Sequence, residues 1–206
     1  MLLDFLEKSI VPIGITHIAG PPNSGKTTML YQTCRGLKKE NKALILDCEI
    51  NFSAQRLREI LIDSEVDLAK IRIISLLNEK QQIRTVMKIQ NFLGKTDFTF
   101  IAINGITDHF RLSKIEKESP KLINLQLAFL QMLNREYNIP IIITNQVTPF
   151  KENEKSFRPV AGSSIKNYID NEIMLIHINK RLWKASVEDE EVYYTINEKG
   201  IEVIKK

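Results

Sequence analysis

Eight consecutive residues near the N-terminus combine the types that bind phosphate. Residues 20–27 read GPPNSGKT, which fits the pattern G-x-x-x-x-G-K-[S/T]. The glycines let backbone N–H groups turn toward phosphate oxygens, and a helix beginning near Gly25 adds the positive end of its dipole. Lys26 can reach the β- and γ-phosphates, and the Thr27 hydroxyl can bind Mg²⁺. We therefore expect ATP and Mg²⁺ to bind this phosphate-binding loop, through Gly20, Asn23, Ser24, Gly25, Lys26, Thr27 and Thr28.

Polar residues that end two other apolar segments are candidate partners of the nucleotide. FTFIAI ends at Asn104, where such loops are usually matched by a carboxylate that helps to hold Mg²⁺. A neutral amide would hold the metal more loosely. Asp47 and Glu49 close the segment ALILD, and Glu49 could act as a general base on the attacking water. Two simpler interpretations stay open, since Asn104-Gly105 is also a β-hairpin signal and Glu49 could equally be an ordinary solvated acid.

Apolar segments alternate five times with helical patterns along the first 144 residues. We expect strands at 14–19, 43–47, 71–75, 97–103 and 139–144, and helices at 26–39, 53–62, 79–93 and 121–138. Ser53 and Ser119 are the expected helix caps, and Pro120 suits a first helical position. This alternation predicts an α/β fold with a mostly parallel sheet flanked by helices on both faces.

The C-terminal third differs in its pattern of polar and apolar residues. Residues 148–167 are polar and carry Pro149, Pro159 and Gly162, so they predict a long loop. Four short strands follow at 172–179, 182–187, 192–196 and 201–204, the last two joined by the turn NEKG. We expect these strands to extend the sheet in antiparallel fashion.

Composition limits the class of protein. The chain has 206 residues, a net charge of +4 and 43% hydrophobic residues, which argues for one globular domain over residues 1–206 and against disorder. Two cysteines at no metal-ligand spacing exclude a disulfide scaffold and a zinc site. With no long apolar segment and no basic, apolar leader, we expect a cytoplasmic protein that makes no membrane contact.

Four segments in order resemble the RecA/RadA recombinase superfamily, most closely its RadB group of short archaeal paralogs. They are the phosphate-binding loop, ALILDCEINFSAQRL at 43–57, FTFIAINGITDHFR at 98–111 and TNQV at 144–147, followed by YTINEKGIEV at 194–203. The resemblance implies a RecA-like ATPase core in which Glu49 is the catalytic glutamate and Gln146 senses the γ-phosphate. It also implies that Arg56 lies near the adenine.

Two departures from the superfamily pattern affect the expected activity. Asn104 replaces the aspartate of the family, so we expect weak or slow ATP hydrolysis. The chain begins almost at the first strand, without a separate N-terminal DNA-binding domain, and residues 4–7 (DFLE) do not match the Phe-x-x-Ala element used for polymerisation. A long filament is therefore less expected than a smaller homo- or hetero-oligomer.

Two basic segments are candidate contacts for single-stranded DNA. Lys151, Lys155, Arg158 and Lys166 follow Gln146 as the DNA-contacting loop of the superfamily does, and Lys180, Arg181, Trp183 and Lys184 surround the only tryptophan. A solvated loop and a core tryptophan are the simpler alternatives. The resemblance implies an accessory recombination protein that binds DNA and assists a RadA-type recombinase or another paralog subunit. The competing hypotheses are a KaiC-like regulatory ATPase that does not act on DNA, and a structural subunit that the nucleotide only stabilises.

Overall fold

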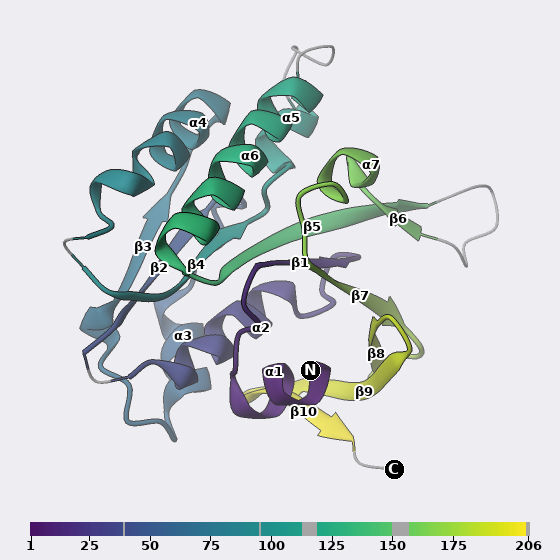
Figure 1. Cartoon of the computed structure of the whole chain (residues 1–206). Helices are drawn as coiled ribbons and strands as arrows, with labels where there is room; N and C mark the ends of the chain where they lie inside the picture. Colours follow the sequence, from purple (N-terminus) through teal and green to yellow (C-terminus); the bar gives the residue numbers. More distant parts are fainter. Residues whose placement is uncertain (39, 95, 113–118, 150–156, 205–206) are drawn as a thin grey trace.

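The computed structural model describes residues 1–38, 40–94, 96–112, 119–149 and 157–204 (Figure 1). The α-helices are α1 (Leu2–Lys8), α2 (Lys26–Thr33), α3 (Ala54–Leu61), α4 (Glu79–Lys88), α5 (Asp108–Leu112), α6 (Ser119–Tyr137) and α7 (Gly162–Ile165). The strands are β1 (Ile15–Gly20), β2 (Lys42–Asp47), β3 (Ile71–Ser75), β4 (Phe98–Asn104), β5 (Ile141–Pro149), β6 (Phe157–Pro159), β7 (Asn171–His177), β8 (Trp183–Val187), β9 (Glu190–Asn197) and β10 (Gly200–Ile204).

The strands of the described residues form one sheet in the order β10-β9-β8-β7-β1-β5-β4-β2-β3, with β6 paired to β5 outside this path. Strand β1 runs parallel to β5 and β7, and β2 runs parallel to β3 and β4. From β7 to β10 each pairing is antiparallel. The predicted parallel sheet with an antiparallel C-terminal extension is therefore confirmed.

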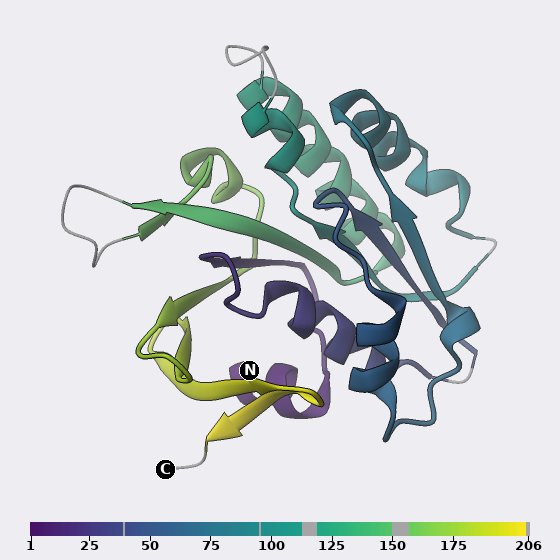
Figure 2. The same cartoon turned by 180° about the vertical axis from the view of Figure 1, so that it is seen from behind.

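The central parallel strands β1, β2 and β4 are buried along nearly their whole length, whereas the edge strand β3 is partly exposed. On β4, Phe100 and Ala102 join a core cluster with residues of α1, α2 and α3, whereas Ile101 and Ile103 join a second cluster with residues of α4, α5 and α6. Figures 1 and 2 show these two groups of helices on opposite faces of the sheet. The continuous apolar segments of the sequence are explained by this double burial.

The closing hairpin β9–β10 folds back onto helix α2, where Figure 2 shows its turn beside α2 and α3. The Gln32 side chain on α2 donates to the carbonyls of Leu6 (2.8 Å) and Ile201 (3.3 Å) and accepts from the N–H of Ile201 (2.7 Å). Arg35 donates to the carbonyl of Lys199 at 2.6 Å. The helix that follows the phosphate-binding loop is thereby fastened to the last strands of the chain.

Several local predictions have clear outcomes. The hairpin interpretation of Asn104-Gly105 is wrong, because β4 pairs in parallel with β2 and β5 and a helix follows it. The long loop predicted at 148–167 is wrong over its described part, because β5 continues to Pro149, pairs with β6 and is followed by α7. The pairing of β5 with β6 provides hydrogen-bond partners for backbone N–H and C=O groups that would be hydrated in the loop predicted from composition.

The predicted helix ends are partly correct. Helices α2 and α4 are shorter than expected, since each ends in a 3-10 turn, at Cys34–Gly36 and Ile89–Asn91. Ser53 caps α3 as predicted, accepting from the N–H of Arg56 at 3.1 Å. Helix α6 begins at Ser119 itself. No helix within the described ranges is both long and apolar enough to cross a membrane. The assignment of residues 1–206 to one domain stays a prediction.

Candidate nucleotide-binding site

The phosphate-binding loop joins the end of β1 to the start of α2, and close packing fixes its shape. A Cβ added to Gly20 would lie 2.6 Å from Ser24 Oγ and 2.7 Å from Leu175 Cβ. Asn23 and Gly25 have left-handed backbones, with φ of 63° and 89°. A Cβ on Gly25 would also meet the Cδ1 atoms of Ile196 and Ile201 at 2.9 Å. The loop therefore depends on glycine at both ends, and the C-terminal hairpin packs directly against it.

A pocket of about 470 Å³ opens beside this loop. It is lined by Pro22, Asn23, Gly25, Lys26, Thr27, Thr28, Glu49, Asn51, Arg56, Gln146 and Ile196. The pocket thus brings together eight of the residues expected at the nucleotide, from four separate segments of the chain. Gly20 and Ser24 are buried beneath it and shape the loop instead. Pro22, Asn51 and Ile196 also line the pocket, although the sequence had assigned no individual role to any of them.

Lys26 is folded back onto the loop that precedes it. Its Nζ donates to the carbonyls of Gly20 (3.0 Å) and Pro21 (2.9 Å), and the residue is only 6% exposed. Burial lowers the pKa of Lys26, while the carboxylates of Glu49 and Asp108 oppose that shift. The ammonium therefore stands at the floor of the pocket beside two acids.

Asn104 is buried at the end of β4 with its amide fully engaged. Its Oδ1 accepts from Thr144 Oγ1 (2.9 Å) and Thr27 Oγ1 (3.4 Å). Its Nδ2 donates to Asp47 Oδ1 (3.0 Å) and Asn51 Oδ1 (3.3 Å). The predicted neighbourhood of Thr27 and Asn104 is present, but both lone pairs of the Asn104 oxygen already have donors.

Glu49 lies on a loop held between β2 and α3. Asp47 Oδ2 accepts from the N–H of Phe52 (3.0 Å), and Asn51 Nδ2 donates to Glu49 Oε2 (2.5 Å). The Tyr31 hydroxyl accepts from the N–H of Ser53 at 3.2 Å, so α2 holds the far end of the loop. Burial first, and then the charge of Asp108, raise the pKa of Glu49. A raised pKa makes a carboxylate a better proton acceptor.

Gln146 stands opposite Gly20 in the pairing of β5 with β1, at the mouth of the loop. Its Oε1 accepts from Arg111 Nη1 at 2.7 Å. The preceding Asn145 accepts from Thr107 Oγ1 (2.6 Å) and donates to the Val160 carbonyl (2.7 Å). The end of β5 is therefore tied both to α5 and to the segment before α7.

Arg56 closes the pocket at the end farther from β5. It donates to the carbonyls of Asn197 (2.5 Å) and Glu198 (2.6 Å) in the β9–β10 turn, and lies 3.4 Å from Glu59 Oε2. Ile196 lines the same end. A fixed guanidinium plane beside an aliphatic side chain is suited to an aromatic base.

Comparisons with known proteins agree with this geometry. The sequence pattern of the Rad51 family matches residues 2–203. The chain belongs to the Rad51 family. Among its curated relatives, the "DNA repair and recombination protein RadB" of Thermococcus onnurineus is 28% identical over 211 residues, covering 97% of this chain and 92% of that protein. The proteins of the same name from Thermococcus sibiricus and Pyrococcus horikoshii are 29% and 30% identical, covering 93% and 91% of this chain and 87% and 85% of theirs.

In this Rad51 family member the first basic segment is only partly described. Lys151 and Lys155 lie outside the described residues. Arg158 lies on β6 and Lys166 follows α7, and both line a cavity of about 530 Å³ beneath the β5–β6 pair. The structure therefore brings together two of the four basic residues expected there.

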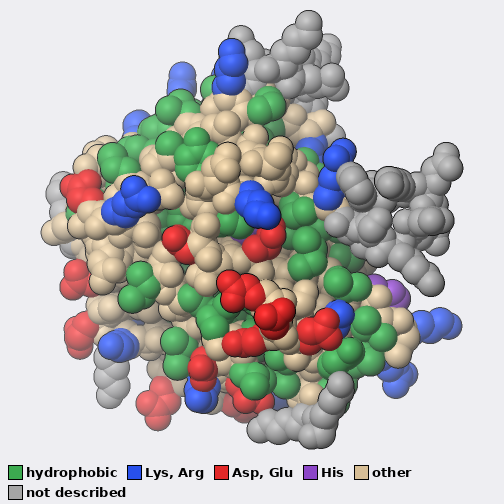
Figure 3. Space-filling view, turned by 45° about the vertical axis from the view of Figure 1, so that its right-hand side comes forward, with side chains coloured by type: hydrophobic (Ala, Val, Ile, Leu, Met, Phe, Trp, Pro, Cys, Tyr) green, Lys and Arg blue, Asp and Glu red, His purple; other side chains and the backbone are tan. Residues whose placement is uncertain are grey.

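The second basic segment surrounds the β7–β8 turn. Lys180 and Arg181 are exposed in that turn, whereas Lys184 pairs with Glu191 Oε1 at 2.6 Å. Trp183 is half-buried, packs against the core and contacts His177 with ring centroids 4.7 Å apart and ring planes tilted by 54°. Of these four residues, only Lys180 and Arg181 are exposed enough to contact the phosphates of DNA. Figure 3 shows acidic side chains gathered near the centre of one face, with Lys and Arg side chains scattered around them.

Proposed function

We propose that this chain is an ATP-binding accessory protein of DNA repair and homologous recombination, which binds single-stranded DNA, assists a RadA-type recombinase and hydrolyses ATP slowly. The convergence of Lys26, Thr27, Glu49 and Gln146 on one pocket, in a member of the Rad51 family, carries this proposal. The RadB name of its relatives supports the recombination role. The relatives come from archaea, whose cells have no nucleus, so a role on chromosomal DNA would place the protein in the cytoplasm.

The pocket fits a nucleoside triphosphate. A nest of backbone N–H groups lies at the start of α2, and Lys26 needs only to leave two backbone carbonyls to reach phosphate oxygens. Arg56 and Ile196 provide a flat and an apolar surface at the other end, where a base would lie. The Glu49 carboxylate would accept the proton of the attacking water, and Gln146 would donate to the terminal phosphate.

The fit to Mg²⁺ is weaker. No group of three or more His, Cys, Asp or Glu suited to a metal ion occurs among the residues that the structure describes. A magnesium ion bound with a nucleotide takes most ligands from phosphates and water, so the Thr27 hydroxyl suffices as a protein ligand. When bound, the ion would supply positive charge to the phosphates. Asn104 offers the metal a neutral amide in place of a carboxylate, and its oxygen already accepts two hydrogen bonds. Both features support slow turnover.

The N-terminal helix supports a small assembly over a filament. Phe5, which the sequence places near the position of a polymerisation element, is 2% exposed and packs in the core of its own chain. Leu2 and Leu6 are buried with it. An aromatic side chain used inside the protomer is not offered to a neighbour, so the proposed partner is a recombinase or paralog subunit that binds elsewhere.

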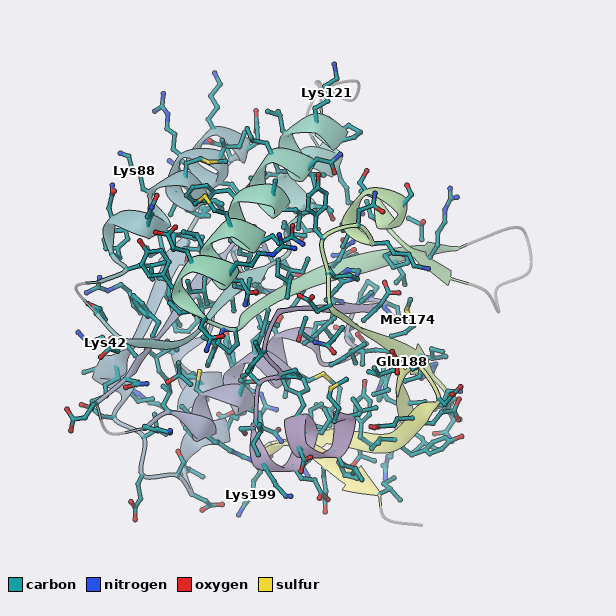
Figure 4. The ribbon with its side chains drawn as sticks, in the orientation of Figure 1. Lys42, Lys88, Lys121, Met174, Glu188 and Lys199 are labelled. Carbon is teal, nitrogen blue, oxygen red and sulfur yellow. The ribbon has the colours of Figure 1, made fainter. Side chains whose placement is uncertain are left out.

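The nucleotide proposal is tested by titrating ATP against the wild type, Lys26→Ala and Lys88→Ala. Lys88 is an exposed lysine on α4, well away from the phosphate-binding loop (Figure 4), and serves as the matched control. We expect Lys26→Ala to lose ATP binding while Lys88→Ala retains wild-type affinity. Retained binding in Lys26→Ala would remove the assignment of the phosphate site.

The DNA proposal is tested with a fluorescent single-stranded oligonucleotide at several salt concentrations. The logarithm of the binding constant should fall linearly with the logarithm of salt concentration, and the double variant Lys180→Ala/Arg181→Ala should reduce the magnitude of this slope by about 1 to 2 because two phosphate contacts are lost. Lys88→Ala should keep the wild-type slope. A chain that hydrolyses ATP without binding DNA would support the regulatory ATPase instead. Tight nucleotide retention without turnover or DNA binding would support the structural subunit.

A further inference from the structure

Asp108, at the start of α5, faces two neighbours at once. Its side chain is 14% exposed, and Oδ1 lies 3.5 Å from Arg111 Nη1. Its Oδ2 is buried and has no hydrogen-bond partner among the described residues. The backbone N–H of Asp108 donates to the carbonyl of Gly105 at 3.0 Å, so the turn between β4 and α5 fixes the position of the residue.

Gly105 creates the space in which the Asp108 and Glu49 side chains converge. Its φ of 79° is in the left-handed region. A Cβ added there would clash with Asp108 Oδ2 and would lie 2.7 Å from Glu49 Cγ. Glu49 Oε1, like Asp108 Oδ2, is buried without a hydrogen-bond partner in the described part of the chain. The Asp108 carboxyl and the Glu49 side chain thus meet at the same glycine, each has one buried oxygen without a partner, and the two carboxyls can share a hydrogen bond if one of them carries a proton.

The charges around this pair are mixed. Lys26 on α2 and Arg111 on α5 favour the carboxylate forms, and Asp47 at the end of β2 opposes them. Asn51 donates to the other oxygen of Glu49. Burial is the largest influence and raises the pKa of both Glu49 and Asp108, and the charge of Asp108 raises the pKa of Glu49 further. Two carboxyls in such a place share one proton more readily than they carry two charges.

Arg111 continues the contacts to the other side of the pocket. Its Nη1 lies 3.5 Å from Asp108 Oδ1 and donates to Gln146 Oε1 at 2.7 Å. The amide oxygen of Gln146 is therefore occupied, and its NH₂ group is left to meet a phosphate oxygen. Removing the Asp108 charge would free Arg111, and with it the orientation of Gln146.

We propose that Asp108 is a positioning residue that links Glu49 to Gln146 through Arg111, so that the base and the phosphate sensor of this pocket are set together. The roles of Glu49 and Gln146 rest on the proposed function, but the link itself does not. The sequence assigned no role to Asp108, because its neighbours Glu49 and Arg111 come from the loop after β2 and from α5.

The test is a carboxyl ¹³C NMR titration of the nucleotide-free chain, with the Glu49 signal assigned by its absence in Glu49→Gln. In Asp108→Asn we expect the Glu49 midpoint to move to lower pH, because a neighbouring negative charge has been removed. Asp63→Asn is the matched control, since Asp63 is 68% exposed and pairs only with Lys199 in the described structure. An unchanged Glu49 midpoint in a folded Asp108→Asn would overturn the proposal.

A second variant tests the other half of the link. Arg111→Gln changes a side chain that is 40% exposed, so the fold should survive. The side-chain ¹⁵N signals of Gln146 should shift in both Arg111→Gln and Asp108→Asn, and stay in place in Asp63→Asn. Side-chain ¹⁵N shifts of Gln146 that are unchanged in Asp108→Asn would overturn the link. Neither measurement uses ATP, so loss of the proposed nucleotide function would leave these results standing, and the reverse also holds.

Discussion

Placing a carboxylate at position 104 should make the stability of the fold depend on bound Mg²⁺ and ATP. In Asn104→Asp an oxygen replaces Nδ2, which now donates to Asp47 Oδ1 at 3.0 Å. Both residues are 2% exposed. The variant loses a hydrogen bond to a charged acceptor, worth about 1.5–3 kcal/mol, and places two buried carboxylates in contact. Protonating one of them at pH 7 limits the repulsion at the cost of up to about 4 kcal/mol.

The expected loss in the free energy of unfolding is therefore about 3 kcal/mol without nucleotide. For a chain of this size that lowers Tm by about 6–12 °C. Adding Mg²⁺ and ATP should close much of the gap, because a bound cation gives the new carboxylate an opposite charge. The same variant should bind Mg²⁺ more tightly and hydrolyse ATP faster than the wild type.

Thermal unfolding with and without Mg²⁺-ATP measures both effects, and Asn134→Asp is the control. Asn134 is also buried and its Nδ2 donates to the Ile139 carbonyl at 2.9 Å, so this variant also loses a buried hydrogen bond. It should also be destabilised, but Mg²⁺ and ATP should not restore its stability beyond their effect on the wild type. Equal Tm for Asn104→Asp and wild type without ligand would refute the argument, as would a turnover that is unchanged or lower.

Two further changes test contacts around the site. Tyr194→Phe removes the 2.8 Å bond from the buried hydroxyl to the Ser24 carbonyl, so we expect a loss of about 1–1.5 kcal/mol, a Tm lower by about 2–6 °C and weaker ATP binding. Tyr137→Phe, on α6, is its control, and equal Tm and ATP affinity in the two variants would contradict the role of that bond. Glu172→Gln tests pH dependence: the hydrogen bond from buried His17, at 3.1 Å, lowers the pKa of Glu172. Its stabilisation is present above the ordinary Glu pKa and is lost as pH falls through the lower folded value. The free energy of unfolding from urea titrations should therefore fall more between about pH 5 and pH 3 in the wild type than in Glu172→Gln, by less than about 1 kcal/mol since Glu172 is partly exposed. Parallel curves of unfolding free energy against pH for the wild type and Glu172→Gln would contradict this stabilising role of Glu172.

The fold followed from local chemistry where that chemistry was strong. The residues GPPNSGKT predict a loop between a strand and a helix, and the structure has that loop between β1 and α2. Doubly apolar segments such as FTFIAI predict strands buried on both faces, which Phe100 and Ile101 confirm by entering opposite cores. Strand ends in a parallel sheet meet at one edge, so Glu49, Asn104 and Gln146 could be expected near the loop.

Other features depended on partners that are distant in the sequence. The pairing of β5 with β6 and the hydrogen bonds between Gln32 and Ile201 join segments whose own composition does not indicate which partner each will meet. The spacing of apolar residues predicts whether a segment is a helix or a strand. It does not predict which distant strand or turn will pack against that segment.

The sequence by itself determined the phosphate-binding loop, the alternating α/β order and the missing carboxylate at Asn104, because each depends on residue type and short-range spacing. Only the tertiary structure decided that Asn104 gives its amide to Asp47, that Trp183 packs inward on His177, and that Asp108 stands between Glu49 and Arg111. Hydrogen-bond partners and buried charges are set by side chains that meet across strands, and no local pattern encodes those meetings.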